Sequence, residues 1–322
     1  MNSTLEKSLA RLSEAPPVET YLTACKEESA DGSVPEILIL FPRFREDEPD
    51  VRTLAEFLWL QAVNYVIPVR LRRRVYEEMK SSPSGADLAS AARLVQRTKR
   101  AFIEFNAKNP YRASEVGELL AYLLALHHLG AVQLASKMAL KTNSNMPVHG
   151  LDGIHARFSD GVMTLFFLES KLAGSADSGV LKYAESVAGF GSNRKQYLLE
   201  YDIIGDLSNL TSLPEEERQL ALTYLDVYGT EKANRLERSV GIICYSDSAL
   251  YSQKLPKTDN TPPAAHEAAL AARLSKQYGA HRDLVGIALS KHGVDHAVCK
   301  VFLIAFPDVD LLRKTFYEVM NG

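Results

Sequence analysis

The dipeptide Asp160-Gly161 stands between two apolar, alternating runs and constrains the fold more than any other feature of the chain. Both central residues of a two-residue hairpin turn need a positive φ angle, which Asp-Gly supplies readily. The flanking runs therefore predict two antiparallel strands in which Ser159 pairs with Val162. The same register brings Asp152 opposite Glu169, where paired Cβ atoms lie roughly 4.5–5.5 Å apart and like charges repel. Two acids in this arrangement predict a cation between them.

The second of these strands is predicted to lie inside a sheet. Alternation puts Leu165, Phe167, Glu169 and Lys171 on one face, and the other face is largely apolar too, which is typical of a strand covered on both sides. The charged residues come where the apolar cover ends, so this end of the strand is the expected place for a site. Ser170 and Lys171 point to opposite faces, which excludes a Ser–Lys hydrolase dyad.

The acid-x-Lys pattern at Glu169-Ser170-Lys171 is weak evidence when taken alone, because a chain of this composition contains about two such triplets by chance. Glu78-Met79-Lys80 is a second example, and there the pattern indicates a solvated helix face. The triplet at 169–171 differs because it ends an apolar strand and faces Asp152. A strand-end salt bridge among Asp152, Glu169 and Lys171 is the plain alternative to a site.

Hard divalent cations such as Mg²⁺ prefer carboxylate and carbonyl oxygens, which Asp152, Glu169 and the backbone carbonyl of Ser170 would supply. Such a cation lowers the pKa of its bound water and neutralises charge on a phosphate. Lys171 would then orient the attacking water or stabilise charge in the transition state. His149 and His155 lie on either side of Asp152 in the sequence, and alternation places both on the opposite face of the strand from Asp152. They are expected to be loop or core residues.

Composition indicates a globular protein that stays in the cytoplasm. The chain is 46% hydrophobic and 24% charged, with no apolar run of membrane-spanning length and no signal pattern at its start. Three cysteines lie far apart and form no zinc spacing, which suits a reducing compartment. The net charge is −3, so a nucleic-acid binder of this composition would need its basic residues gathered locally.

Periodicity predicts a mostly helical N-terminal region over residues 1–110 and a second domain over 111–322. The first region contains a strand at 37–41 and three helices. These are expected at 51–66, after the break at Pro68 to about residue 80, and at 86–105. In the second domain, Ser114 and Gly130 mark the expected start and end of one helix. Further helices are expected at 178–189, 194–203, 214–228 and from 308, and strands at 240–245 and 298–306. The fold class is therefore α/β or α+β, with a mixed central sheet flanked by helices.

An acid at the head of one strand and Glu-x-Lys on its antiparallel neighbour resemble the PD-(D/E)xK nuclease superfamily. The resemblance implies a restriction-endonuclease-like core and a further acid on a preceding helix. Glu118 fits that role, and Glu115, one turn earlier, is the rival. Leu151 stands where the superfamily name has proline, which is a common variation.

Three segments narrow the resemblance to the HamA family, the nuclease subunits of the Hachiman anti-phage defence system. These segments are 117–124, 141–153 and 167–171. The resemblance implies an Mg²⁺-dependent deoxyribonuclease, with Mn²⁺ as a substitute, in which Glu118, Asp152, Glu169 and Ser170 hold metal and Lys171 supports the nucleophile. It also implies a heterodimer with a superfamily 2 helicase, HamB, which releases or activates the nuclease when infection or DNA damage is sensed.

Basic residues outside the strand pair are candidates for phosphate contacts, which hold DNA without reading its sequence. Arg194 and Lys195 begin a predicted helix after the strand pair and are predicted DNA-binding residues. Two further groups, at 70–74 and 93–100, suit either an ordinary solvated helix face or a protein surface. Two other functions stay open: a catalytically degenerate nuclease fold that acts as a regulatory or DNA-binding subunit, and an interaction scaffold whose hairpin acids form a salt bridge.

Overall fold

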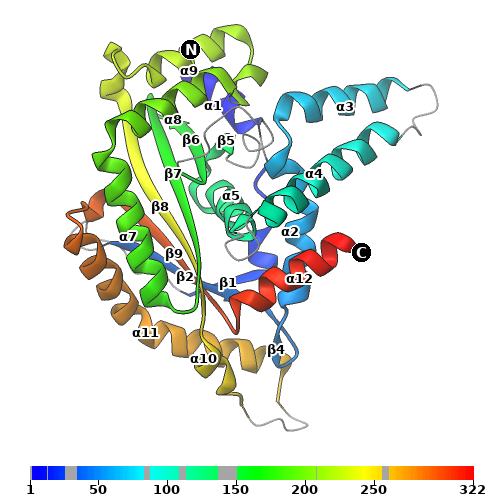
Figure 1. Ribbon diagram of the computed structural model, residues 1–322, viewed down its shortest axis with the longest axis vertical. Helices are drawn as coiled ribbons and strands as arrows, with labels where there is room; N and C mark the ends of the chain where they lie inside the picture. Colours follow the sequence, from blue (N-terminus) through cyan, green and yellow to red (C-terminus); the bar gives the residue numbers. More distant parts are fainter. Residues whose placement is uncertain are drawn as a thin grey trace. The chain divides into compact units, whose positions relative to one another are not determined.

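The chain is described by a computed structural model that covers residues 2–12, 14–25, 35–82, 88–108, 114–136, 151–207, 209–255 and 261–322. These residues form two compact units that are interleaved along the sequence. Figure 1 labels their helices and strands. The first unit comprises residues 1–16, 60–167 and 193–237, and the second comprises residues 17–59, 168–192 and 238–322. Each unit takes residues from both sides of position 110, and the domains 1–110 and 111–322 remain a prediction.

The central sheet is mixed, with strand order β1-β2-β9-β8-β7-β6-β5. Its strands are β1 (Leu22–Ala24), β2 (Glu36–Pro42), β5 (Val132–Ser136), β6 (Gly153–Ser159), β7 (Val162–Ala173), β8 (Arg235–Ser246) and β9 (Cys299–Phe306). The long strands β7 and β8 each contribute residues to both units. The predicted α/β class with a mixed sheet is confirmed, and β7 is an inner strand as expected.

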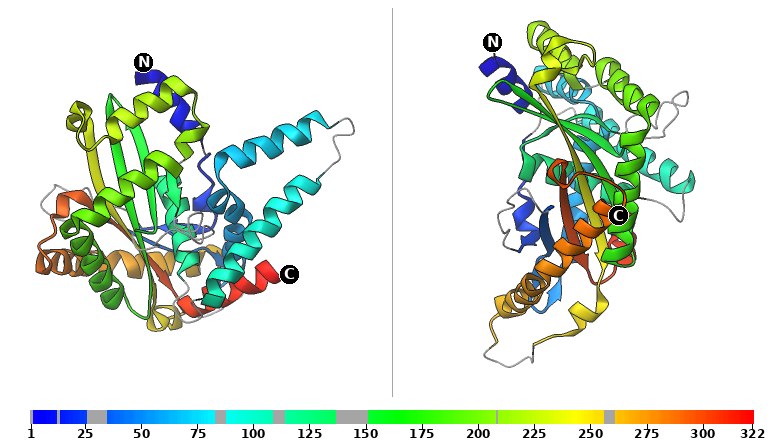
Figure 2. Two further views of the ribbon diagram at one scale, coloured as in Figure 1. Left: turned by 45° about the horizontal axis from the view of Figure 1, so that its top comes forward. Right: turned by 90° about the vertical axis from the view of Figure 1, so that its left-hand side faces the viewer.

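The second unit is built on parallel strands. β9 pairs in parallel with both β2 and β8, and apolar residues at alternate positions of these strands form a core with α7 (Ala176–Ser192) and α11 (Pro263–Lys291). Figure 2 shows these two helices beside each other. The unit also contains η1 (Val18–Thr20), β3 (Phe44–Arg45), β4 (Glu48–Pro49), α10 (Ser248–Ser252), η4 (His296–Val298) and α12 (Val309–Asn321). α2 (Val51–Val66) begins in this unit and ends in the first.

The first unit surrounds an antiparallel part of the sheet, in which β5 pairs with β6 through an irregularity between Gln133 and Ala135. α5 (Glu115–Leu129) packs on both strands, and α1 (Asn2–Ala10) packs on β6. α5 ends at Gly130, whose φ of 58° is the left-handed conformation that the sequence predicted for a helix stop. The unit also contains α3 (Val69–Ser81), α4 (Ala89–Lys108), α8 (Arg194–Leu207), η2 (Asn209–Ser212), α9 (Glu215–Leu225) and η3 (Thr230–Asn234).

The turn between β6 and β7 is the predicted two-residue turn. Asp160 and Gly161 have φ angles of 52° and 80°, and the strands end at Ser159 and begin at Val162. Both positive angles are the condition for the tight turn that matches the twist of the two strands. Asp152 lies one residue before β6, and its pairing with Glu169 stays a prediction.

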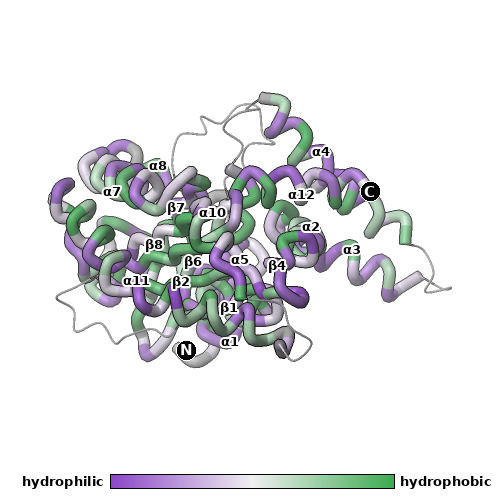
Figure 3. The backbone as a smooth tube through the Cα atoms, turned by 90° about the horizontal axis from the view of Figure 1, so that it is seen from below, coloured by the Kyte–Doolittle hydropathy of each residue, from purple (hydrophilic) through white to green (hydrophobic). Residues whose placement is uncertain are grey.

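Several elements match their predicted ranges closely, above all α2, α3 and β9. The prediction of a mostly helical N-terminal region missed three short strands, β1, β3 and β4, together with α1, and α11 was not predicted either. Figure 3 shows the sheet strands as largely hydrophobic and much of α3 as hydrophilic. Among the described residues, no helix combines the length and apolar character needed to cross a membrane. Four predictions fall wholly or mostly outside the described residues. They are residues 83–85 of a turn expected over 81–85, a loop at 141–145, His149 and most of a loop expected at 256–263.

Candidate metal and nuclease site

The first turn of α5 carries two buried acids. Glu115 is fully buried and Glu118 is 2% exposed, within a helix whose other residues are almost all apolar and buried. Ser114 precedes the helix, but its hydroxyl makes no bond to a backbone N–H there and instead donates to Oε1 of Glu118 at 3.2 Å. A buried carboxylate needs such donors because it has lost its water. The predicted helix acid is therefore held in a defined orientation.

Tyr65 of α2 supplies the second donor to this carboxylate. Its hydroxyl donates to Oε2 of Glu118 at 2.9 Å. Burial first, then the nearby carboxylates of Glu118, Asp152 and Glu115, raise the pKa of Tyr65 well above its usual value. The phenol therefore stays protonated and keeps donating. The two predicted metal ligands of the first unit, Glu118 and Asp152, thus lie near enough to the Tyr65 hydroxyl to affect its pKa. The same holds for Glu115, the alternative helix acid.

Asp152 is itself buried, with 7% of its surface exposed, and the backbone just before it is tied to α8. The N–H of Leu151 donates to Oε1 of Glu200 at 3.3 Å, and Glu200 is 6% exposed. Nothing in the spacing along the chain relates Glu200 to Asp152, so sequence patterns did not identify it. Its carboxylate holds the chain that carries the predicted metal ligand.

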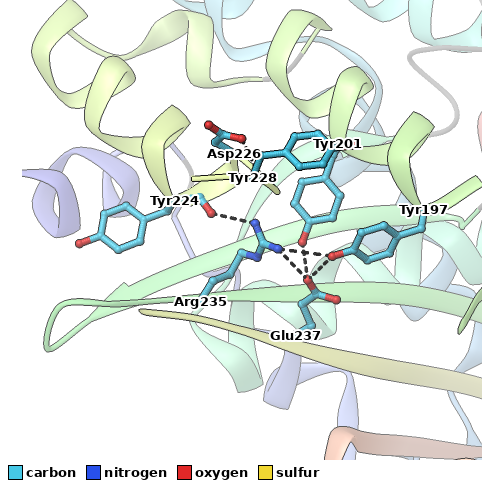
Figure 4. Close-up of polar contacts among 7 residues, drawn as sticks. All are labelled: Tyr197, Tyr201, Tyr224, Asp226, Tyr228, Arg235 and Glu237. Atoms are coloured by element: carbon cyan, nitrogen blue, oxygen red, sulfur yellow. Dashed lines mark hydrogen bonds and ion pairs between the residues drawn. The ribbon is translucent and has the colours of Figure 1, made fainter. Parts of the chain in front are cut away.

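α8 is in turn anchored to the start of β8 by a compact polar cluster (Figure 4). Tyr197 and Tyr201 both donate to Oε1 of Glu237, at 2.7 and 2.6 Å. Arg235 makes an ion pair with Glu237 at 3.3 Å and lies over the Tyr201 ring. Burial, followed by interactions with Glu237, raises the pKa of Tyr201 above its usual value, so its hydroxyl stays a donor. The helix that bears Glu200 is thereby fixed at two successive turns.

The second unit holds the Glu-x-Lys triplet at the end of β7. Glu169 is 9% exposed and Ser170 3% exposed, and the Lys171 ammonium forms an ion pair with the Glu169 carboxylate. Both charged side chains belong to the same face of the strand, as alternation predicted. By contrast, Glu78 of the other triplet is exposed on α3 and pairs with Arg74. Burial distinguishes the two occurrences of the same pattern.

A protein-family comparison bears on this arrangement. The model of the HamA family matches residues 19–320, which is nearly the whole chain. The chain belongs to the HamA family. It is therefore a subunit of the Hachiman anti-phage defence system. A search of curated proteins found no match.

In this HamA-family chain the predicted site residues form two groups. Glu118 and Asp152 lie in the first unit, and Glu169, Ser170 and Lys171 lie in the second. Within neither unit do the described residues gather three His, Cys, Asp or Glu side chains as ligands for a metal ion. The donors predicted to bind metal are nonetheless buried carboxylates and a backbone carbonyl, which are the oxygen ligands that Mg²⁺ accepts. Their chemistry fits the metal that the sequence predicted.

Two further predictions for this HamA-family chain concern the basic residues Arg194 and Lys195 and the histidine His155. Arg194 and Lys195 are exposed at the start of α8, three and two residues before Tyr197, where a phosphate group can reach them. His155 is a core residue, as expected: it is 1% exposed, its ring lies 5.9 Å from that of Tyr122, and burial lowers its pKa to about 3. A neutral histidine in this place packs inside the first unit.

Proposed function

We propose that the chain is an Mg²⁺-dependent deoxyribonuclease that cleaves phosphodiester bonds as the effector of the Hachiman system. The observation that supports this most directly is the ion pair at the end of an inner strand between buried Glu169 and partly buried Lys171. Burying a charge such as the Glu169 carboxylate costs free energy before its attraction to Lys171 is counted. Such a pair is expected where its charges take part in binding or catalysis. Membership of the HamA family is consistent with catalysis of DNA cleavage.

The metal ligands of this proposal are the carboxylates of Glu118, Asp152 and Glu169 and the carbonyl oxygen of Ser170. When bound, Mg²⁺ supplies an activated water and neutralises charge on the phosphate. The hydroxyl groups that donate to Glu118 are neutral, so they orient the carboxylate and leave its negative charge for a cation. Such outer hydrogen bonds commonly set ligand orientation at metal sites.

Lys171 has the role of stabilising negative charge on the scissile phosphate and orienting the nucleophile. Glu169 holds the ammonium group in place, so its position does not depend on the substrate. Charge that is already oriented before the reaction stabilises a transition state at little reorganisation cost. Arg194 and Lys195 contribute phosphate contacts from the start of α8, and these position DNA without reading its sequence.

The proposal includes a partner, because a nuclease effector in a cell must be held inactive until it is needed. The HamA family membership supports a superfamily 2 helicase, HamB, as the other subunit of a heterodimer. The helicase would then couple sensing of infection or DNA damage to the activity of this subunit.

The test is DNA cleavage by the chain alone and by its complex with the helicase, with Mg²⁺ or with EDTA, in the presence of ATP. Glu169→Gln and Lys171→Met should each lower the cleavage rate at least about 100-fold, as loss of a charge-stabilising group commonly does. Glu78→Gln is the matched control, since it alters the same triplet on an exposed helix, and it should cleave like the wild type. Wild-type rates in Glu169→Gln contradict the nuclease proposal.

Calorimetry of Mg²⁺ binding separates the remaining outcomes. Wild-type binding that is lost in Asp152→Ala supports the metal site. A wild type that binds DNA but neither binds Mg²⁺ nor cleaves is a degenerate, DNA-binding subunit, and that result also overturns the proposal.

A further inference from the structure

The antiparallel helices α3 and α4, termed here the basic helix pair (Val69–Ser81 and Ala89–Lys108), carry a concentrated positive charge. α3 has five Arg and Lys residues against two acids, and α4 has five against one, which gives a net charge of +7. The whole chain has a net charge of −3, so everything outside these helices carries −10. Figures 1 and 2 show the two helices side by side, and both lie in the first unit.

The cations of α4 are arranged as a stripe. Arg93, Arg97 and Arg100 are all exposed and follow the i, i+4, i+7 spacing that places side chains on one face of a helix. The opposite side of α4 is buried at Thr98 and Phe102, both 0% exposed. The arginine stripe therefore points to solvent because the helix packs by its other side.

On α3 the arginines divide between structural and exposed roles. Arg72 bonds the carbonyl of Ile67 and the side chain of Asn64, which ties it to the preceding helix. Arg73 is exposed and donates to the carbonyls of Ser212 and Arg11, which are neutral groups and leave its charge in place. Among the described residues, a single ion pair lies on the basic helix pair, Arg74 with Glu78. Most of the charge is thus available to an outside anion.

The basic helix pair also carries exposed apolar residues. Tyr76 is 61% exposed, and it lies within one helical turn of Arg73 and Lys80. An exposed aromatic ring among cations is the arrangement on which single-stranded bases stack. Val95 and Ile103 of α4, and Leu88 just before it, are exposed by 41, 46 and 60%. This also suits a protein partner, so the experiment must distinguish the two kinds of ligand.

We propose that the basic helix pair is a surface that binds the sugar-phosphate backbone of DNA. A chain whose remainder carries −10 repels a polyanion unless a local excess of cations attracts it. The 33 residues of these helices hold ten cations against three acids. Seven of the ten cations are arginines. A guanidinium group can bind a phosphate through two hydrogen bonds. The surface follows from the charge distribution, and the choice of DNA as the polyanion rests on the proposed function.

The experiment measures DNA binding by fluorescence anisotropy with a labelled duplex and a labelled single strand of about 30 nucleotides, in EDTA so that no cleavage occurs. The variant Arg93→Gln/Arg97→Gln/Arg100→Gln removes the stripe and keeps good helix formers. The matched control Arg52→Gln/Lys291→Gln/Lys314→Gln removes the same charge from exposed positions of the second unit. Thermal melting checks that both variants fold.

The salt dependence gives the quantitative result. Each lost phosphate contact lowers the slope of log K against log salt by about 0.9 on duplex DNA. The stripe variant should therefore lose about 2.7 from the slope between about 50 and 200 mM salt, and the control should keep the wild-type slope. A stripe variant with wild-type affinity and slope overturns the proposal. So does one that keeps DNA binding but no longer co-purifies with the helicase, because the surface then binds protein.

Two assays separate this inference from the nuclease proposal. The stripe variant is judged by DNA binding in EDTA and Glu169→Gln by DNA cleavage in Mg²⁺, so each proposal is tested by its own variant. If the wild type fails to cleave while the stripe variant loses binding, the DNA surface is supported and the nuclease proposal fails. If cleavage depends on Glu169 while the stripe variant binds DNA like the wild type, the nuclease proposal is supported and the DNA surface proposal fails.

Discussion

The hydroxyl of Tyr65 donates a hydrogen bond to the carboxylate of Glu118 at 2.9 Å, although the two residues are 53 positions apart in the chain. The bond joins the end of α2 to the first turn of α5 and orients a predicted metal ligand. Both side chains are 2% exposed, so neither group exchanges its partner for water.

Replacing Tyr65 with Phe should remove this donor and keep the ring that packs on Tyr122. A lost hydrogen bond to a buried carboxylate costs about 1.5–3 kcal/mol of unfolding free energy. Urea denaturation measures it. Tyr278→Phe is the control, because the hydroxyl of Tyr278 donates to the neutral carbonyl of Ile37, and it should cost about 0.5–1.5 kcal/mol. If metal binds as proposed, Tyr65→Phe also weakens Mg²⁺ binding about 10-fold or more.

Glu200→Ala should release the N–H of Leu151 and loosen the segment that carries Asp152. The expected cost is about 1–3 kcal/mol of unfolding free energy, since a buried donor loses its acceptor. Glu200→Gln keeps an acceptor oxygen and should cost clearly less. Glu216→Ala, at an exposed position of α9, should change stability by less than about 0.5 kcal/mol. Equal costs for the Ala and Gln variants of Glu200 contradict a role as acceptor.

Two glycines of α7 should respond in opposite directions to alanine. A Cβ on Gly179 would lie 2.4 Å from Cγ2 of Ile243, whereas a Cβ on Gly189 meets nothing within 4 Å. Overpacking commonly costs about 1–3 kcal/mol, and an unstrained Gly→Ala change in a helix stabilises by about 0.4–1 kcal/mol. Gly179→Ala should therefore lower the melting temperature and Gly189→Ala should raise it. A stabilised Gly179→Ala variant would show that α7 and β8 separate easily.

The buried imidazole of His155 should make the fold sensitive to mild acid. Its pKa is lowered to about 3 by burial, against about 6.5 in the unfolded chain. Between these values the unfolded state binds the extra proton, so stability is lost as pH falls below about 6.5. The loss from pH 7.5 to 5.5 is about 1.4 kcal/mol. Urea midpoints at both values should show that loss in the wild type relative to His155→Phe, and parallel curves for the two proteins contradict it.

Local patterns predicted the elements that depend on local physics. The turn at Asp160-Gly161 needs only the two residues that accept positive φ, and α2 needs only its apolar spacing and the break at Pro68. The inner position of β7 follows from apolar residues on both faces. Short strands such as β1, with three residues, exist because a partner strand supplies their hydrogen bonds, and no pattern in three residues reveals that partner.

The candidate site shows the same division between local and distant information. Glu169 and Lys171 could be selected as site residues because the apolar pattern predicts the strand that carries them. Tyr65 and Glu200 could not, because each acts through a contact between distant segments. α11 escaped prediction since its alanine-rich sequence has weak apolar periodicity. Tertiary contacts identify residues that support a site, and the sequence identifies those that carry its charge.

The parallel pairing of β2 with β9 has a consequence for how the protein is made. Glu36 forms an ion pair with Lys300, 264 positions later in the chain. At about 5–20 residues per second, a ribosome needs roughly 13–50 s to supply the partner of β2. During that interval the segment Ile37–Phe41 is a strongly apolar strand with β1 on one edge and its other edge unpaired, and such an edge is prone to aggregation until β9 has been synthesised.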